Sequence, residues 1–103
     1  MHITLSPVFC ADPLTLQCAG DVLTVNGEVF DFTRLPEGAT LPQAAVDCRW
    51  LASDIHRIDG VLHLTLILPH GANAPEETRF PKVLTLSADG PVPLPPYEVL
   101  DEN

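Results

Sequence analysis

The fold of this chain is decided by residues 55–68, which read IHRIDGVLHLTLIL. The pair Asp59-Gly60 inside this stretch is typical of a two-residue hairpin turn, because both turn positions must adopt positive φ. Placing Ile58 opposite Val61 brings the alternate apolar side chains of both strands to one face. The side chains on that predicted core face are Leu51, Ile55, Leu62, Leu64, Leu66 and Leu68. We therefore expect a long antiparallel hairpin that buries one face.

A second hairpin, extended to a three-stranded meander, is predicted at residues 13–32. Its turn is Asn26-Gly27, which also favours positive φ at both positions and which pairs Val25 with Glu28. An upstream strand at residues 14–18 alternates in the same way and completes the meander. The predicted core face of this hairpin carries Leu23, Val25, Phe30 and Phe32.

The remaining sequence supports an all-β fold. Alternating stretches at residues 3–5 and 83–86 bring the total to about seven short strands. Eleven prolines interrupt the chain, and proline both lacks an N–H and clashes inside a helix. We expect at most one or two helical turns. One lies at residues 44–46, after a capping box that begins at Thr40, and the other follows Pro75. The alternative for the first turn is a longer helix that reaches Trp50. The predicted architecture is an antiparallel meander that forms a small sandwich or a partly open barrel.

The domain organisation follows from length and proline content. A chain of 103 residues has room for one modest core. We expect residues 1–90 to form a single β domain and residues 91–103 to form a proline-rich, acidic tail that ends in solvent. Residues 93–96 of that tail also match the loose pattern of a proline-rich groove ligand, although a stiff exposed arm that packs along its own domain or along a neighbour is the favoured interpretation.

The charge balance excludes several partners. Five Lys and Arg oppose fourteen Asp and Glu, which gives a formal charge of −9. Because phosphate neutralisation supplies most non-specific affinity for nucleic acid, we expect neither nucleic acid nor an anionic membrane to bind. The longest unbroken apolar run, residues 8–11, is far shorter than the roughly 20 residues of a spanning helix. The expected location is the cytoplasm of a bacterial host on synthesis, with the virion as a later location.

Cys10, Cys18 and Cys48 are too widely and unevenly spaced for a paired zinc-ligand pattern. We expect three reduced thiols that behave as small apolar side chains. A disulfide between Cys10 and Cys18 is the alternative if their strands are neighbours.

The hairpin turn at residues 59–60 also places two histidines together. His56 and His63 oppose each other across the two strands, with β-carbons about 4.5–5.5 Å apart, and Asp54 is a third metal-ligand candidate. Two imidazoles and one more distant carboxylate form an incomplete ligand set. The prediction is therefore no cofactor and no metal, with His56, His63 and Asp54 as weak metal candidates and a solvent-facing or interface-facing polar pair as the favoured interpretation.

Catalytic motifs are not found in this sequence. It contains no nucleophile elbow, P-loop, HExxH motif or dinucleotide-binding fingerprint. The loop at residues 69–81 carries His70 and acidic side chains, but acid–base catalysis also requires a tuned pKa and fixed positions. We predict a protein that is not an enzyme and has no catalytic residues.

A protein interface is predicted on the second face of the long hairpin. Strand alternation places four apolar side chains there, opposite the core face: Trp50, Ile58, Val61 and Ile67. A ribbon that is apolar on both faces is typical of a surface covered by a partner or by further strands.

Several motifs resemble one group of proteins. They are GDVLTVNG at residues 20–27, FDF at 30–32, LPEGA at 35–39, IDG at 58–60, LHL at 62–64 and LPHGANAPEETRFP at 68–81. This pattern is similar to small uncharacterised proteins encoded in bacteriophage and prophage genomes, usually among virion or tail genes. The resemblance implies a phage-associated accessory or structural role, and it assigns no site residues.

Together these observations favour a non-enzymatic structural, assembly or accessory protein of a phage that acts through protein–protein binding. The expected partner is a phage structural or assembly component, or a second copy of the chain. One alternative is a small metal-dependent or hydrolytic enzyme that uses His56, His63 and His70. Another is an acidic inhibitor of a host nucleic-acid-binding protein, which would require carboxylates clustered on one face.

Overall fold

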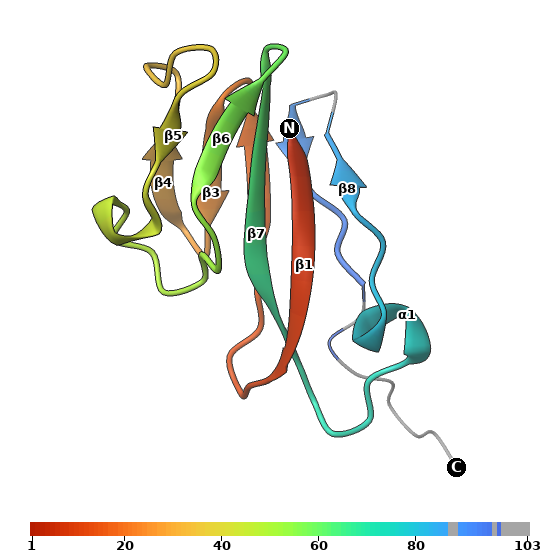
Figure 1. Ribbon diagram of the computed structural model, residues 1–103. Coiled ribbons are helices and arrows are strands. Elements are labelled where there is room, and N and C mark those ends of the chain that lie inside the picture. Colours follow the sequence, from red (N-terminus) through yellow and green to blue (C-terminus); the bar gives the residue numbers. More distant parts are fainter. Residues whose placement is uncertain (87–88, 96, 98–103) are drawn as a thin grey trace.

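The two predicted hairpins lie at the centres of two separate sheets. We describe a computed structural model in which residues 1–86, 89–95 and 97 are placed (Figure 1). Within these residues the strands are β1 (His2–Phe9), β2 (Leu16–Ala19), β3 (Val22–Val25), β4 (Glu28–Asp31), β5 (Thr40–Leu41), β6 (Ile55–Ile58), β7 (Val61–His70), β8 (Leu84–Thr85) and β9 (Gly90–Pro91). Sheet A has the order β5-β6-β7-β1-β8, and sheet B has the order β4-β3-β2-β9. The fold is all-β, as predicted.

Both hairpin registers are confirmed. In sheet B, β3 and β4 pair with Val25 opposite Glu28, and in sheet A, β6 and β7 pair with Ile58 opposite Val61. The turn residues have positive φ, with 49° at Asn26, 82° at Gly27, 51° at Asp59 and 77° at Gly60. These turns form where the sequence predicts them because both depend only on neighbouring residues.

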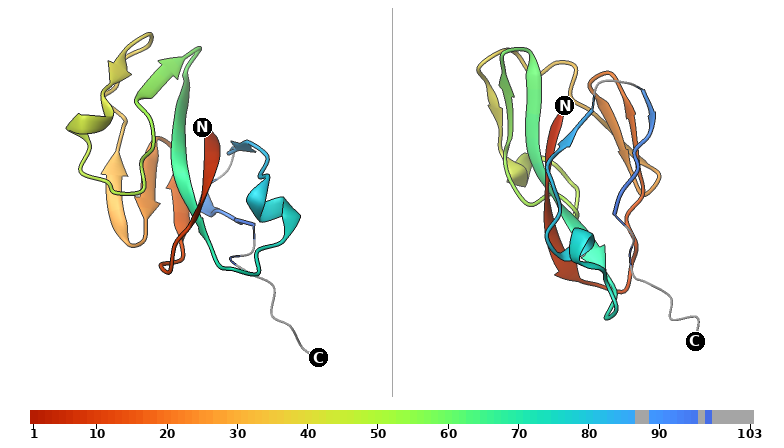
Figure 2. Two further views of the ribbon diagram at one scale, coloured as in Figure 1. Left: turned by 60° about the horizontal axis from the view of Figure 1, so that its bottom comes forward. Right: turned by 90° about the vertical axis from the view of Figure 1, so that its right-hand side faces the viewer.

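The core lies between the two sheets, which face each other in the right-hand view of Figure 2. Each sheet contributes the face that strand alternation predicts. The buried apolar side chains are Ile3, Leu5, Leu14, Leu16, Cys18, Leu23, Val25, Phe32, Trp50, Leu51, Ile55, Leu62, Leu64, Leu66, Leu68 and Val92. The two sheets thus form a small sandwich.

The first strand departs from a simple meander. β1 pairs in parallel with β7 along its whole length, from His2 opposite His63 to Phe9 opposite His70. It also pairs with β8 in the antiparallel direction over its first two residues. The strand predicted at residues 3–5 is therefore longer, and it lies inside sheet A between two strands from the second half of the chain.

Pro7 is compatible with a strand inside this sheet because of where its peptide nitrogen points. Met1 exchanges backbone hydrogen bonds with Leu86 beside β8, so the odd-numbered residues of β1 direct their peptide groups toward that side. Since β8 pairs only with the start of β1, the missing N–H of Pro7 interrupts no ladder among the described strands.

Trp50 does not lie where strand alternation places it. It occupies a turn closed by a hydrogen bond of 3.2 Å from the N–H of Leu51 to the carbonyl of Cys48. The inward–outward alternation of β6 does not extend back along the chain into this turn, so it does not direct the Trp50 side chain to the outer face. Trp50 is only 8% exposed and joins the core cluster. The guanidinium of Arg49 lies 4.4 Å from the centre of its ring.

The helical segments are short. A 3-10 turn (Gln43–Ala45) and one α-helical turn, α1 (Glu76–Arg79), confirm the two predicted positions, and no described helix reaches Trp50. Thr40 belongs to β5 and does not cap the 3-10 turn, which follows Pro42 without a side-chain cap.

The first part of the predicted tail packs on the domain. β9 pairs with β2, the backbone N–H of Val92 donates to the carbonyl of Leu16, and the Val92 side chain is buried. Pro96, in the proline-rich motif, and the acidic end at residues 101–103 lie outside the described residues. Cys10, Cys18 and Cys48 are free thiols.

Candidate functional site

The four predicted interface residues are not brought together. Trp50 is buried in the core, and Ile67 is half-buried and packs against the core from the outer face of sheet A. Ile58 is 51% exposed and Val61, its partner across the hairpin, is half-buried. Of the predicted set, therefore, only Ile58 offers a large apolar surface, at the β6–β7 turn.

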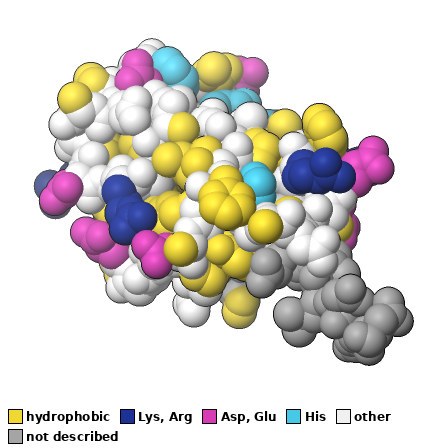
Figure 3. Space-filling model, turned by 90° about the horizontal axis from the view of Figure 1, so that it is seen from below, with side chains coloured by type: hydrophobic (Ala, Val, Ile, Leu, Met, Phe, Trp, Pro, Cys, Tyr) yellow, Lys and Arg dark blue, Asp and Glu magenta, His cyan; other side chains and the backbone are white. Residues whose placement is uncertain are grey.

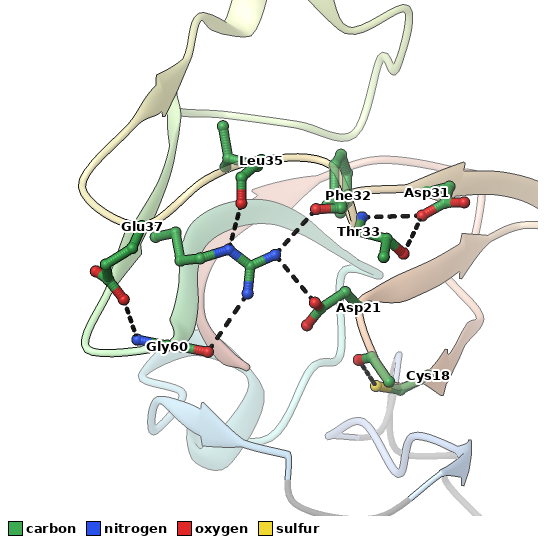
Figure 4. A network of polar contacts seen from close by, with 10 residues as sticks. Cys18, Asp21, Asp31, Phe32, Thr33, Leu35, Glu37 and Gly60 are labelled. Atoms are coloured by element: carbon green, nitrogen blue, oxygen red, sulfur yellow. Dashed lines mark hydrogen bonds and ion pairs between the residues drawn. The ribbon is translucent and has the colours of Figure 1, made fainter.

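Arg57 anchors that turn to the rest of the molecule (Figure 4). Its guanidinium donates to the carboxylate of Asp21 and to the carbonyl of Phe32, both at 3.0 Å, and its Nε donates to the carbonyl of Leu35. A longer contact of 3.4 Å reaches the carbonyl of Gly60. Because Asp21 belongs to the β2–β3 turn of sheet B, the network ties the two sheets together.

Three other carboxylates, outside the Arg57 network, accept hydrogen bonds from backbone N–H groups. Glu37 accepts from the N–H groups of Asp59 and Gly60 and so holds the second side of the β6–β7 turn. Asp89 accepts from the N–H of Gly20 at 2.8 Å, next to the β2–β3 turn. The carboxylate of Asp31 accepts hydrogen bonds from the hydroxyl and from the backbone N–H of Thr33. Both hydrogen bonds lower the pKa of the Asp31 carboxyl group, and the one from the hydroxyl contributes more. These acidic side chains support separate turns on both sheets.

Burial determines the direction of the pKa shift at two of the thiols. Loss of water around Cys18 raises the pKa of its thiol, and its Sγ lies 3.6 Å from the carbonyl of Gly20, to which it donates. Burial also raises the pKa of Cys48, although the backbone N–H groups of Trp50 and Leu51 partly offset this. Neither thiol is poised as a nucleophile, since the thiolate is disfavoured at both positions.

The predicted histidine pair is formed. His56 lies opposite His63, and both line a shallow hollow of about 230 Å³ on the outer face of sheet A. Asp54 lines the same hollow, but one of its carboxylate oxygens already accepts the N–H of Gln43 at 2.8 Å. Among the described residues, no three metal-ligating side chains converge as they stand.

His70, which the enzymatic alternative requires, lies far from this pair. It is seven residues beyond His63 on β7, at the opposite end of a fully extended strand. Its Nδ1 lies 3.0 Å from the carbonyl of Gly71. The three histidines of that alternative therefore do not form one site.

One exposed aromatic surface lies at the end of the molecule where β1 and β7 finish. Phe9 is 71% exposed and Val8 is 41% exposed, and the Phe9 ring meets the edge of His70 with 6.1 Å between ring centroids. Seen from this end, hydrophobic side chains gather across the middle and charged side chains lie around the rim (Figure 3). Next to Phe9 in the chain, the carbonyl of Cys10 accepts a hydrogen bond of 2.6 Å from the hydroxyl of Tyr97.

The sequence contains a signal for this surface. Residues 8–11 are its longest apolar run, and a continuous run breaks the inward–outward alternation of a strand. One apolar side chain of the pair Val8 and Phe9 must then face outward, and both are in fact exposed because β1 ends there.

A second exposed aromatic follows α1. Phe80 is 71% exposed, Arg79 lies 5.9 Å from its ring centre, and Val83 nearby in sequence is 54% exposed. The ring borders an open groove between the segment before β8 and residues 93–95. Thus two of the four phenylalanines present most of their ring surface to solvent.

Comparison of the chain with protein-family models, with curated proteins and with solved structures finds no match. Among the described residues, no helix is long and apolar enough to cross a membrane.

Proposed function

We propose that this chain is a non-enzymatic structural, assembly or accessory protein of a bacteriophage that acts by binding another protein. The observation that carries the binding role is Phe9, an aromatic side chain that is 71% exposed at the last position of β1, beside the exposed Val8. The phage assignment is supported by the resemblance of residues 20–81.

The surface around Phe9 has the make-up of a binding site. Interfaces place aromatic anchors at the centre and polar groups at the rim, and a few such anchors supply most of the binding energy. Burying one phenylalanine side chain contributes about 1.5–3 kcal/mol. A protein that leaves such a ring in water gains this stabilisation only when a partner covers it.

The ring is also presented by a rigid part of the fold. β1 pairs with β7 along its whole length, as far as Phe9 itself, and with β8 at its first two residues. Its other end is fixed by the Met1 bonds to Leu86. Because little ordering is needed when a partner binds, the entropy cost of association is low. The partner is a phage structural or assembly component, and a second copy of the chain is the alternative.

A photo-crosslinking amino acid at position 9 tests this proposal in cells that carry the phage genes. The matched control carries the same group at Val29, which is 64% exposed on β4, the edge strand of sheet B. We expect a discrete crosslinked species from position 9 that position 29 does not give. An excess of the unlabelled wild-type chain should compete this species away, whereas an excess of Phe9→Ser protein should not. Equal products from both positions, or equal competition by both chains, would refute it. The mass of the product separates a second copy from another protein.

A further inference from the structure

Three histidines lie in one row across the outer face of sheet A. The register places His56 of β6 opposite His63 of β7, and His63 opposite His2 of β1. The row continues to a threonine at each side, with Thr40 of β5 beside His56 and Thr85 of β8 beside His2. Directly opposed residues on adjacent strands share a face, so the three imidazoles stand on the same side of the sheet.

This side faces away from the core. The sequence neighbours of the histidines, Ile3, Ile55 and Leu64, are at most 4% exposed and point into the sandwich. The histidines therefore point outward, with His2 and His63 half-buried and His56 exposed.

Two of the three rings are already in contact. The centroids of His2 and His63 are 4.8 Å apart, with an angle of 71° between the ring planes. This edge-to-face packing holds the two imidazole rings close enough for both to reach one metal ion. The pair is formed by the parallel β1–β7 ladder, which joins residues 61 positions apart in sequence.

The third ring, that of His56, is next in the row and is exposed to solvent. Nδ1 of His56 lies 2.9 Å from the hydroxyl oxygen of Thr40, on the side away from His63. This contact explains why the three rings do not converge as they stand. Since His56 is exposed, rotation about its side-chain bonds exchanges one hydrogen bond to a hydroxyl for a bond to a metal.

We propose that His2, His63 and His56 bind one Zn²⁺ ion on the outer face of sheet A. Zinc accepts neutral imidazole nitrogens in a tetrahedral arrangement, and three histidines leave a fourth position for water. The hollow beside the row is lined by Thr4, Ser53 and Asp54, which provide polar groups for that water. The formal charge of −9 on the whole chain also favours binding of a cation over binding of an anion. This site is independent of the apolar end around Phe9.

Calorimetric titration of ZnCl₂ into the full chain, prepared without a histidine tag, tests the proposal. The row variants are His2→Asn, His63→Asn and His56→Asn, each checked for a native circular dichroism spectrum, and the control is His70→Asn, at the far end of β7. We expect one zinc ion per chain, at least about tenfold weaker binding in each row variant, and unchanged binding in the control. At one zinc concentration, the melting temperature should also rise more in the wild type and the control than in the row variants, because zinc binds the folded state.

Three results would overturn the assignment. The first is the lack of saturable zinc binding by the wild type. The second is a row variant that binds zinc as tightly as the wild type, since each of the three imidazoles is assigned as a ligand. The third is an equal loss of affinity in His70→Asn, which would place the zinc elsewhere. If His63→Asn loses its native spectrum, His63→Gln takes its place.

Discussion

The guanidinium of Arg57 and the carboxylate of Asp21 lie 3.0 Å apart and join sheet A to sheet B. The Arg57 side chain is 12% exposed and that of Asp21 is 36% exposed, so the pair is partly shielded from water. Carbonyl oxygens of Phe32 and Leu35 satisfy further N–H groups of the same guanidinium. By contrast, the Arg49–Asp12 pair is about two-thirds exposed on both sides.

Replacement of Arg57 by Met should destabilise the fold by about 2–3 kcal/mol, because a half-shielded carboxylate and two carbonyls lose their donor. Urea unfolding followed by Trp50 fluorescence measures the loss. Asp12→Asn is the control: it breaks the exposed Arg49–Asp12 pair, leaves Arg49 on the Trp50 ring, and should cost less than about 1 kcal/mol, since exposed ion pairs contribute little. Equal losses in the two variants would show that the link between the sheets adds no stability.

Leu66 lies at the centre of the core and is 0% exposed, so Leu66→Ala should cost about 2–5 kcal/mol in the same unfolding experiment. Val29→Ala on β4 removes an apolar side chain that is 64% exposed and should change stability by at most about 0.5 kcal/mol. A small effect at Leu66 would contradict the placement of the core between the sheets.

Gly60→Ala isolates the backbone cost of the β6–β7 turn. Gly60 has φ of 77°, and a methyl group added there meets nothing within 4 Å. We therefore expect a loss of about 1–2 kcal/mol from the left-handed conformation alone. Gly27→Ala should give a loss of the same size, because its φ is 82° and its surroundings are equally open. A neutral result at both positions would argue against these turns.

The thiols of Cys18 and Cys48 should react slowly with an alkylating agent in the folded protein. Burial raises the pKa of both groups, so the folded state disfavours the reactive thiolate. The stability that these two neutral thiols contribute to the fold is present below the thiol pKa of the unfolded chain. It is lost as pH rises through the higher thiol pKa of the folded state. Mass spectrometry of each cysteine at mildly alkaline pH, with and without urea, tests this. Equal rates in the two conditions would contradict the burial of these side chains.

The carboxyl group of Asp31 should titrate below its ordinary pKa because Thr33 donates to it from its hydroxyl and from its backbone N–H. A lowered pKa in the folded state means that this contribution to stability is present above the unfolded value of about 3.9 and is lost as pH falls through the folded pKa. Thr33→Val removes the hydroxyl donor and should raise the pKa toward the ordinary value. Carboxyl ¹³C chemical shifts followed by NMR measure it, and an unchanged titration would exclude the hydroxyl as the cause.

The parts of the fold that depend on neighbouring residues were predictable. The turns Asn26-Gly27 and Asp59-Gly60 set both hairpin registers, and strand alternation then identified most of the core. Trp50 was misplaced because alternation was continued into residues that form a turn. The pairing of His56 with His63 followed from one local turn in the same way.

The sequence by itself determined the all-β class, the two hairpins and the faces that they bury, because side-chain parity and turn conformation are local properties. The tertiary structure alone decided that β1 enters sheet A beside β7, since a parallel pair of strands needs no turn signal and is formed here as Ile3 and Leu5 pack into the core. That one placement brings His2 to His63 and leaves Phe9 exposed at the end of the sheet. Both proposed sites therefore include the β1–β7 contact, which joins residues far apart in the chain and which no turn signal predicts.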